Sequence, residues 1–176
     1  MTVAEEVVRR ARSLGATIAV AESLTGGALA SAIVDVPGAS AVLRLGVVAY
    51  DTAMKASVLG VDAGMLAERG PVDAGVAAQM AAGVRALADV AGPATIGVST
   101  TGVAGPEQQG GHAVGEVHVG IATTRGTRSV ERALAGDRAA IRAATVEAAL
   151  AELLVELDGI HRPSTDATGS EQEYEM

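Results

Sequence analysis

The chain has 176 residues, of which 49% are apolar, and a formal net charge of −8. Nucleic acid is not an expected partner, because binding its phosphates requires a clustered basic surface. The sequence contains no cysteine, which excludes disulfides, thiolate catalysis and cysteine zinc sites. No apolar run reaches the roughly 20 residues that span a bilayer, and the charged segment 1–12 is not typical of a secretory signal. We therefore expect a cytoplasmic protein with no membrane partner.

The first half of the chain predicts alternating helices and strands. Residues 2–14 place apolar side chains at helical spacing, and 16–21 form a short run of small and β-branched residues that is typical of a strand. A helix is expected from about 24 to 34, a buried strand over 45–50 and a short helix over 52–59.

The second half predicts a helix, a strand, a hairpin and a long final helix. Residues 60–71 are rich in turn formers, with one helical turn around Met65. The expected elements that follow are a helix over 74–90, a strand over 95–99, a glycine-rich loop over 101–114, paired strands over 116–124 and 128–134, and a helix from the cap Asp137 to about 157.

This order of elements indicates one domain with an α/β fold. Strands that alternate with helices, followed by a hairpin, predict a three-layer α/β/α sandwich with a mixed sheet over residues 1–157. Because the chain has no Phe and no Trp, small aliphatic side chains must fill the core, which requires close approach of the helices to the sheet. Residues 158–176 turn polar and acidic, and we expect them to form a disordered tail.

Ser23 lies where the first strand turns into a helix, within the segment AESLTGG at 21–27. Such a turn leaves several backbone N–H groups unpaired, and Gly26 and Gly27 let a ligand come close. A serine at this position is most often only a helix cap. A role as nucleophile requires a base nearby.

Lys55 is the candidate base. We expect it in the first turn of the 52–59 helix, where the helix dipole disfavours an ammonium and lowers the pKa of the amine. A neutral lysine can accept the proton of a serine hydroxyl. Tyr50 ends the preceding strand; it is either a core or rim residue, or a group that holds Lys55 through its hydroxyl or flanks a ligand ring.

The loop TGVAGP at 101–106 follows the third strand, so Thr101 and Gly102 join Ser23 and Tyr50 at the carboxyl ends of strands. Ligands of open α/β sheets bind at that edge, and one crevice is expected there. Arg138 and Arg142, four residues apart near the start of the last helix, form either a phosphate or carboxylate site or ion pairs with local acids.

No metal site or cofactor is expected. His112 and His118 have no acidic partner at the spacing of metal ligands, and the sequence has neither a dinucleotide-binding nor a P-loop glycine motif.

Six motifs in order carry a resemblance to a known family. They are AESLTGG at 21–27, DVPGAS at 35–40, GVVAYDTAMKASVLGV at 46–61, TGVAGP at 101–106, VGEVHVGIAT at 114–123 and AGDRAAIR at 135–142. Together they resemble the C-terminal domain of the competence/damage-inducible CinA family over residues 3–157. The stand-alone members of that family are nicotinamide mononucleotide deamidases of the PncC type.

The resemblance implies a homodimeric serine–lysine amidase that needs no metal or cofactor. Its substrate would be nicotinamide mononucleotide, whose carboxamide is hydrolysed to nicotinate mononucleotide and ammonia. Ser23 would be the nucleophile and Lys55 the general base, with Tyr50 and Thr101 orienting the pair or polarising the amide. The implied substrate-binding residues are Thr25, Gly26 and Gly27 as oxyanion donors, Gly102 in the loop after the third strand, and Arg142 with Arg138 on the 5′-phosphate.

The loop over 107–113 departs from the family pattern. Family members usually continue the AGP motif with further glycines and a Lys-Pro, whereas this chain reads EQQGGHA. An acidic, less flexible rim weakens binding of an anionic nucleotide. Two alternatives therefore stay open: a nucleotide-binding module with weak catalysis, and hydrolysis of a different small amide or ester by the same serine.

Overall fold

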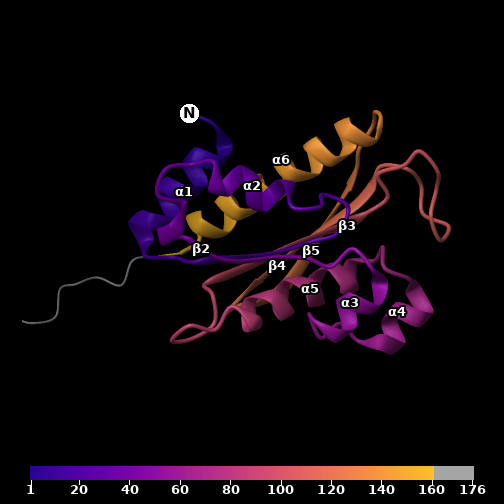
Figure 1. Cartoon of the computed structure of the whole chain (residues 1–176), viewed down its shortest axis with the longest axis horizontal. Coiled ribbons are helices and arrows are strands. Elements are labelled where there is room, and N and C mark those ends of the chain that lie inside the picture. Colours follow the sequence, from indigo (N-terminus) through magenta and orange to yellow (C-terminus); the bar gives the residue numbers. More distant parts are fainter. Residues whose placement is uncertain (161–176) are drawn as a thin grey trace, which may run out of the picture.

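The computed structural model of the protein describes residues 1–160. A five-stranded sheet with the order β2-β1-β3-β4-β5 forms its centre (Figure 1). The strands are β1 (Ile18–Glu22), β2 (Leu43–Val48), β3 (Ile96–Gly102), β4 (Glu116–Thr123) and β5 (Gly126–Ala133). β1, β2 and β3 are parallel, whereas β4 and β5 pair antiparallel as a hairpin. The predicted mixed sheet is confirmed.

Helices cover both faces of this sheet. In Figure 1, α1 (Val3–Leu14), α2 (Ala28–Val34) and α6 (Arg138–Asp158) lie on one side, and α3 (Thr52–Ser57), α4 (Ala63–Arg69) and α5 (Ala74–Leu87) lie on the other. A short 3-10 helix, Ala39–Ala41, precedes β2. The predicted three-layer α/β/α sandwich is therefore confirmed.

The core consists of aliphatic side chains, and two glycines set the distance between α5 and the sheet. A Cβ atom on Gly97 or Gly120 would lie 2.1 Å from a backbone carbonyl of α5, that of Ala81 or Ala77. Because such a contact is impossible, only glycine lets α5 pack this closely on β3 and β4. Close backbone packing is how a chain without Phe or Trp fills its core.

Several elements differ from those expected, among them α2, β2 and α4. α2 begins at Ala28 rather than near 24, because the Glu22 carboxylate binds the amides at its start. β2 is not a buried strand but the edge of the sheet, and along it half-buried and exposed side chains alternate. α4 has two turns where one was expected, since the Asp62 side chain caps it through the amide of Met65.

At the carboxyl end, α6 includes Asp158, where the polar tail was expected to begin. The rest of that expected tail, from 161 on, lies outside the described residues. Within residues 1–160, no helix is long and apolar enough to cross a membrane.

Candidate active site

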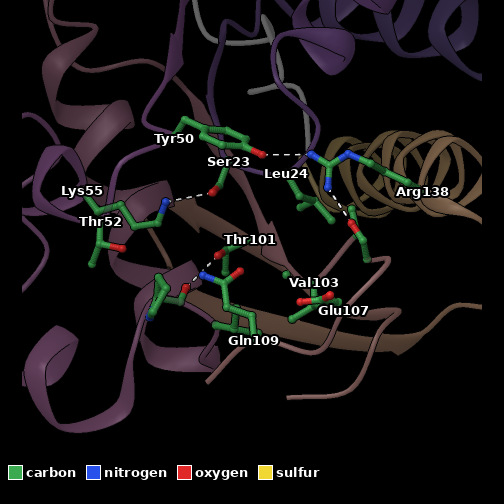
Figure 2. A pocket seen from close by; sticks show the side chains of 15 residues that line it. Ser23, Leu24, Tyr50, Thr52, Lys55, Thr101, Val103, Glu107, Gln109 and Arg138 are labelled. Atoms are coloured by element: carbon green, nitrogen blue, oxygen red, sulfur yellow. Dashed lines mark hydrogen bonds between the residues drawn. The ribbon is translucent and has the colours of Figure 1, made fainter. Parts of the chain in front are cut away.

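The carboxyl ends of β1, β2 and β3 meet at one cavity of about 120 Å³ (Figure 2). Ser23 after β1, Tyr50 after β2, and Thr101 and Gly102 at the end of β3 all line it. Lys55 reaches the same cavity from α3. The crevice predicted at this edge of the sheet is therefore present.

Ser23 and Lys55 contact each other. Lys55 Nζ lies 2.9 Å from Ser23 Oγ (Figure 2). It donates a second hydrogen bond to the carbonyl of Ala49 at 2.6 Å. Ala49 is itself tied to β1, because its N–H donates to the Glu22 carbonyl at 2.9 Å. The first two strands thus bring the hydroxyl and the amine together.

Burial makes Lys55 an unusual lysine. Its side chain is 1% exposed, and this desolvation lowers the pKa of its amine from 10.5 to about 8, against the opposing effect of Asp51. We expected the helix dipole to cause this shift, but α3 has only six residues and Asp51 caps it. At pH 7.5 about a quarter of amines with a pKa of about 8 are neutral, against about one in a thousand at 10.5.

Arg138 and Tyr50 lie together at the rim of the cavity. Arg138 donates to the Tyr50 hydroxyl at 2.9 Å and to the Gly105 carbonyl at 2.8 Å (Figure 2). Tyr50 is 61% exposed, so it is a rim residue, and its hydroxyl binds Arg138 rather than Lys55. Its ring therefore borders the cavity, where it can meet a ligand.

Thr101 and Gly102 form part of the cavity wall at the end of β3. The Thr101 hydroxyl donates to the Pro71 carbonyl at 2.7 Å, so it does not orient the Ser23–Lys55 pair. A Cβ on Gly102 would lie 2.6 Å from the Glu116 carbonyl oxygen, which explains the glycine by packing. Both residues line the cavity without touching the pair.

Four other candidate residues lie behind the cavity wall. The Gly27 amide is bound by the Glu22 carboxylate at 3.0 Å, and the Gly26 amide by the Ser23 carbonyl at 3.1 Å. Arg142 donates to the carbonyls of Leu24 and Thr25 rather than into the cavity. Thr25 is fully buried and its hydroxyl pairs with that of Thr100 at 2.7 Å.

Sequence reasoning missed the contacts of one carboxylate, Glu22, and had already singled out another, Glu107, as part of the acidic loop over 107–113. Glu22 is buried next to Ser23. Because it ends a strand whose other residues are all apolar, little in the sequence indicated its contacts. Glu107, in the loop after β3, lines the cavity together with Gln109.

The expectation about the histidines was incorrect in one respect. Glu116 is the acidic partner of both, at 2.6 Å from His112 Nδ1 and 3.5 Å from His118 Nε2. Side chains two apart on β4 share a face, and the loop after β3 returns His112 to it. Among residues 1–160, no group of three or more His, Asp or Glu side chains is arranged to hold a metal ion.

Known proteins resemble this chain over nearly all of the residues that the structure describes. The family model for the CinA C-terminal domain matches residues 1–157. A CinA-like protein of Frankia casuarinae is 49% identical over 154 residues, which are 88% of this chain and 35% of that protein. A CinA-like protein of an Anaeromyxobacter species is 49% identical over 139 residues, or 77% of this chain and 32% of its own. This chain spans about a third of the length of these curated relatives.

Solved structures of similar length have the same fold. The competence/damage inducible protein CihA from Agrobacterium tumefaciens is 35% identical, with a TM-score of 0.78 over 90% of this chain and 97% of its own. A CinA superfamily protein from Escherichia coli is 29% identical, with a TM-score of 0.82 over 86% of this chain and 87% of its own. From its sequence and its fold alike, the chain belongs to the CinA C-terminal domain family.

Proposed function

We propose that the protein is an amidase that hydrolyses the carboxamide of nicotinamide mononucleotide to nicotinate mononucleotide and ammonia. The observation that carries this proposal is the 2.9 Å contact between Ser23 Oγ and Lys55 Nζ, with the amine buried. A hydroxyl becomes an effective nucleophile when a neutral base lies within hydrogen-bond reach. The family resemblance supplies the substrate.

In the first half of the reaction, neutral Lys55 takes the proton of Ser23 while Oγ attacks the carboxamide carbon. The Ala49 carbonyl accepts one N–H of the amine and so leaves its lone pair for the serine proton. Collapse of the tetrahedral intermediate breaks the C–N bond, and the Lys55 ammonium protonates the departing nitrogen, which leaves as ammonia. The acyl group is then an ester of Ser23.

In the second half, water replaces ammonia. Lys55, neutral again, takes a proton from the water as its oxygen attacks the ester carbon. Breaking the bond to Oγ returns that proton to Ser23 and releases the carboxylic acid, which then loses its remaining proton to water and becomes the carboxylate product. One amine therefore serves as base and acid in both halves.

The size of the cavity fits the reacting end of such a substrate. Sites for whole drug-sized ligands usually have volumes of roughly 300–1,000 Å³, and this cavity has about 120 Å³. The carboxamide and part of the ring would enter, next to Tyr50, and the ribose phosphate would lie at the rim. Arg138 is the cation at that rim and the proposed ligand of the phosphate.

A specific observation favours a second candidate, hydrolysis of an uncharged small amide or ester. Glu107 lines the same cavity, and its negative charge repels a phosphate. The chemistry of Ser23 and Lys55 would be the same, and only the specificity would differ. A homodimer in the cytoplasm remains part of the proposal through the family resemblance alone.

The test is ammonia release from a panel of nicotinamide mononucleotide, nicotinamide riboside and nicotinamide. We expect turnover of the mononucleotide that is lost in Ser23→Ala and in Lys55→Ala. Preference for an uncharged amide would favour the second candidate. Nucleotide binding by calorimetry without any ammonia release would replace the amidase by a binding module, and unchanged turnover in both variants would refute the mechanism.

A further inference from the structure

The segment Ser23–Gly27, here called the nucleophile loop, connects β1 to α2 and is held from two sides. Glu22 binds its carboxyl-terminal end, and Arg142 of α6 binds its middle. We propose that these contacts shape the backbone of the loop into an oxyanion hole for Ser23, and that Arg142 is a positioning residue rather than a ligand of the substrate. This inference rests on the proposed serine mechanism.

Glu22 occupies the amides at the start of α2. Its carboxylate accepts hydrogen bonds from the N–H groups of Gly27, Leu29 and Ala30, at 3.0, 3.0 and 2.8 Å. Gly27, the N-cap of α2, has no side chain to do so. A helix start offers an anion its unpaired N–H groups. Because Glu22 already binds them, the oxyanion donors must come from elsewhere in the loop.

Arg142 holds two successive carbonyls. Its Nε donates to the Leu24 carbonyl at 2.9 Å, and a terminal guanidinium nitrogen donates to the Thr25 carbonyl at 2.7 Å. The rigid fork of a guanidinium suits two acceptors at fixed spacing, which the single ammonium of a lysine does not match. The side chain thereby fixes the peptide planes on either side of Thr25.

These bonds dictate where the amides point. In a trans peptide the N–H points opposite to the carbonyl, so the grip on the Leu24 carbonyl directs the Thr25 amide away from α6. In the same way, the bond from the Gly26 amide to the Ser23 carbonyl fixes the direction of the Leu24 amide. Among residues 1–160, neither the Leu24 nor the Thr25 amide has a hydrogen-bond acceptor, although both residues are buried.

Unpaired N–H groups in a buried loop are rare, because each costs about as much as a lost hydrogen bond. Two of them directly follow the nucleophile, and Leu24 lines the cavity beside Ser23 (Figure 2). In many hydrolases the amide of the residue after the nucleophile is an oxyanion donor. The structure assigns the Leu24 amide, next to Ser23 in the cavity wall, to the oxygen that becomes negative when Ser23 attacks.

Two measurements test the role of Arg142, and the second does so independently of the identity of the substrate. One is steady-state hydrolysis of nicotinamide mononucleotide; the other is the rate at which a fluorophosphonate labels Ser23, which needs the nucleophile and oxyanion donors but no nucleotide. The variants are Arg142→Gln, Arg142→Lys and, for chemical rescue, Arg142→Ala. Arg85→Gln is the matched control, because Arg85 also donates to a backbone carbonyl, that of Thr95, but before β3 starts.

For Arg142→Gln we expect kcat to fall about 100-fold with KM within about twofold, since loss of an oxyanion donor costs about 10²–10³ in kcat. The labelling rate should fall in parallel, and Arg142→Lys should recover little of either. Adding guanidinium at low millimolar concentration to Arg142→Ala should raise its labelling rate, which a generally misfolded variant would not permit. Arg85→Gln should label like the wild type.

Several outcomes would overturn the inference. A raised KM with unchanged kcat in Arg142→Gln would make Arg142 a substrate ligand, as the sequence suggested. Unchanged labelling would show that the loop keeps its shape without Arg142. If the wild type labels but does not hydrolyse the mononucleotide, the proposed substrate fails and the labelling series still decides the role of Arg142. If the wild type does not label at all, both the proposed serine mechanism and the role of Arg142 are refuted.

Discussion

Two regions of the molecule that bury ionic groups contrast in whether those groups have partners of opposite charge. On α6, Glu152 and Glu156 are each 8% exposed and form ion pairs with arginines of β5 and of the turn before it. Arg125 binds Glu156 at 2.6 Å, and Arg128 binds both glutamates at 2.8 and 2.9 Å. Every charge there has a partner.

Lys55 is buried more completely and has no such partner. Its Nζ contacts a hydroxyl and a carbonyl, and no carboxylate of residues 1–160 lies within ion-pair distance. Pairing keeps charges ionised and holds two elements together. Burial without pairing instead shifts the pKa toward neutral pH, which costs stability and yields a base. The comparison predicts that substitutions in the ion pairs of α6 leave activity unchanged. Substitutions of Lys55 should abolish it.

The largest effect is expected for Lys55→Met, a substitution of similar shape without the amine. Activity should fall about 10³–10⁴-fold, because proton transfer in both half-reactions depends on this group. The free energy of unfolding at pH 7 should rise by roughly 1–3 kcal/mol, because the cost of burying a partly protonated amine disappears. Ammonia release and urea unfolding measure the two effects. A variant that is both inactive and less stable would contradict the comparison.

The pH dependence of the wild type should follow Lys55. With a pKa of about 8 in the folded protein, kcat/KM should rise about tenfold per pH unit below that value and level off above it. The rate at which a fluorophosphonate labels Ser23 should rise with pH in the same way, since the probe itself does not titrate.

The same shift predicts a stability change of defined sign. Between pH 8 and 10.5 the unfolded chain holds more protons on Lys55 than the folded chain, so stability should rise with pH across that interval. The rise should be absent in Lys55→Met, which isolates it from the titration of other groups.

At the paired region, Glu152→Gln should lower the free energy of unfolding by about 1–2 kcal/mol. Removing one partner of a buried pair is costly, but Arg128 and Arg132 are about 40% exposed and partly solvated. Activity at a temperature well below the melting transition should stay at the wild-type level. Loss of kcat in the folded variant would show that the two regions are coupled.

The smallest effect is expected at Glu107, which lines the candidate active site and has no ion-pair partner among residues 1–160. Glu107→Gln should lower the KM for the mononucleotide about two- to fourfold and leave kcat unchanged, because an exposed charge acts through screened repulsion. The difference should shrink in high salt. An uncharged substrate such as nicotinamide riboside provides the control, for which KM should not change.

Much of this could be predicted from the sequence, because local patterns determine the elements and parallel strands bring their carboxyl ends together. That rule placed Ser23 and Lys55 at one edge of the sheet, where they meet. The pattern of β2 did not reveal an edge strand, since the order of strands depends on packing between distant segments. Nor did the spacing of Arg138 and Arg142 show that one reaches the cavity rim and the other the loop carbonyls. Glu22 binding α2 in place of a cap is likewise visible only in three dimensions.

The contact between Lys55 and the Ala49 carbonyl has a consequence for the speed of proton exchange. A backbone oxygen does not titrate, and it can accept a hydrogen bond both from an amine and from an ammonium. The Lys55 side chain can therefore keep the same position in its neutral and in its protonated form. A carboxylate in that position would bind the ammonium far more tightly and hold on to the proton, so that each catalytic cycle would have to overcome that preference twice.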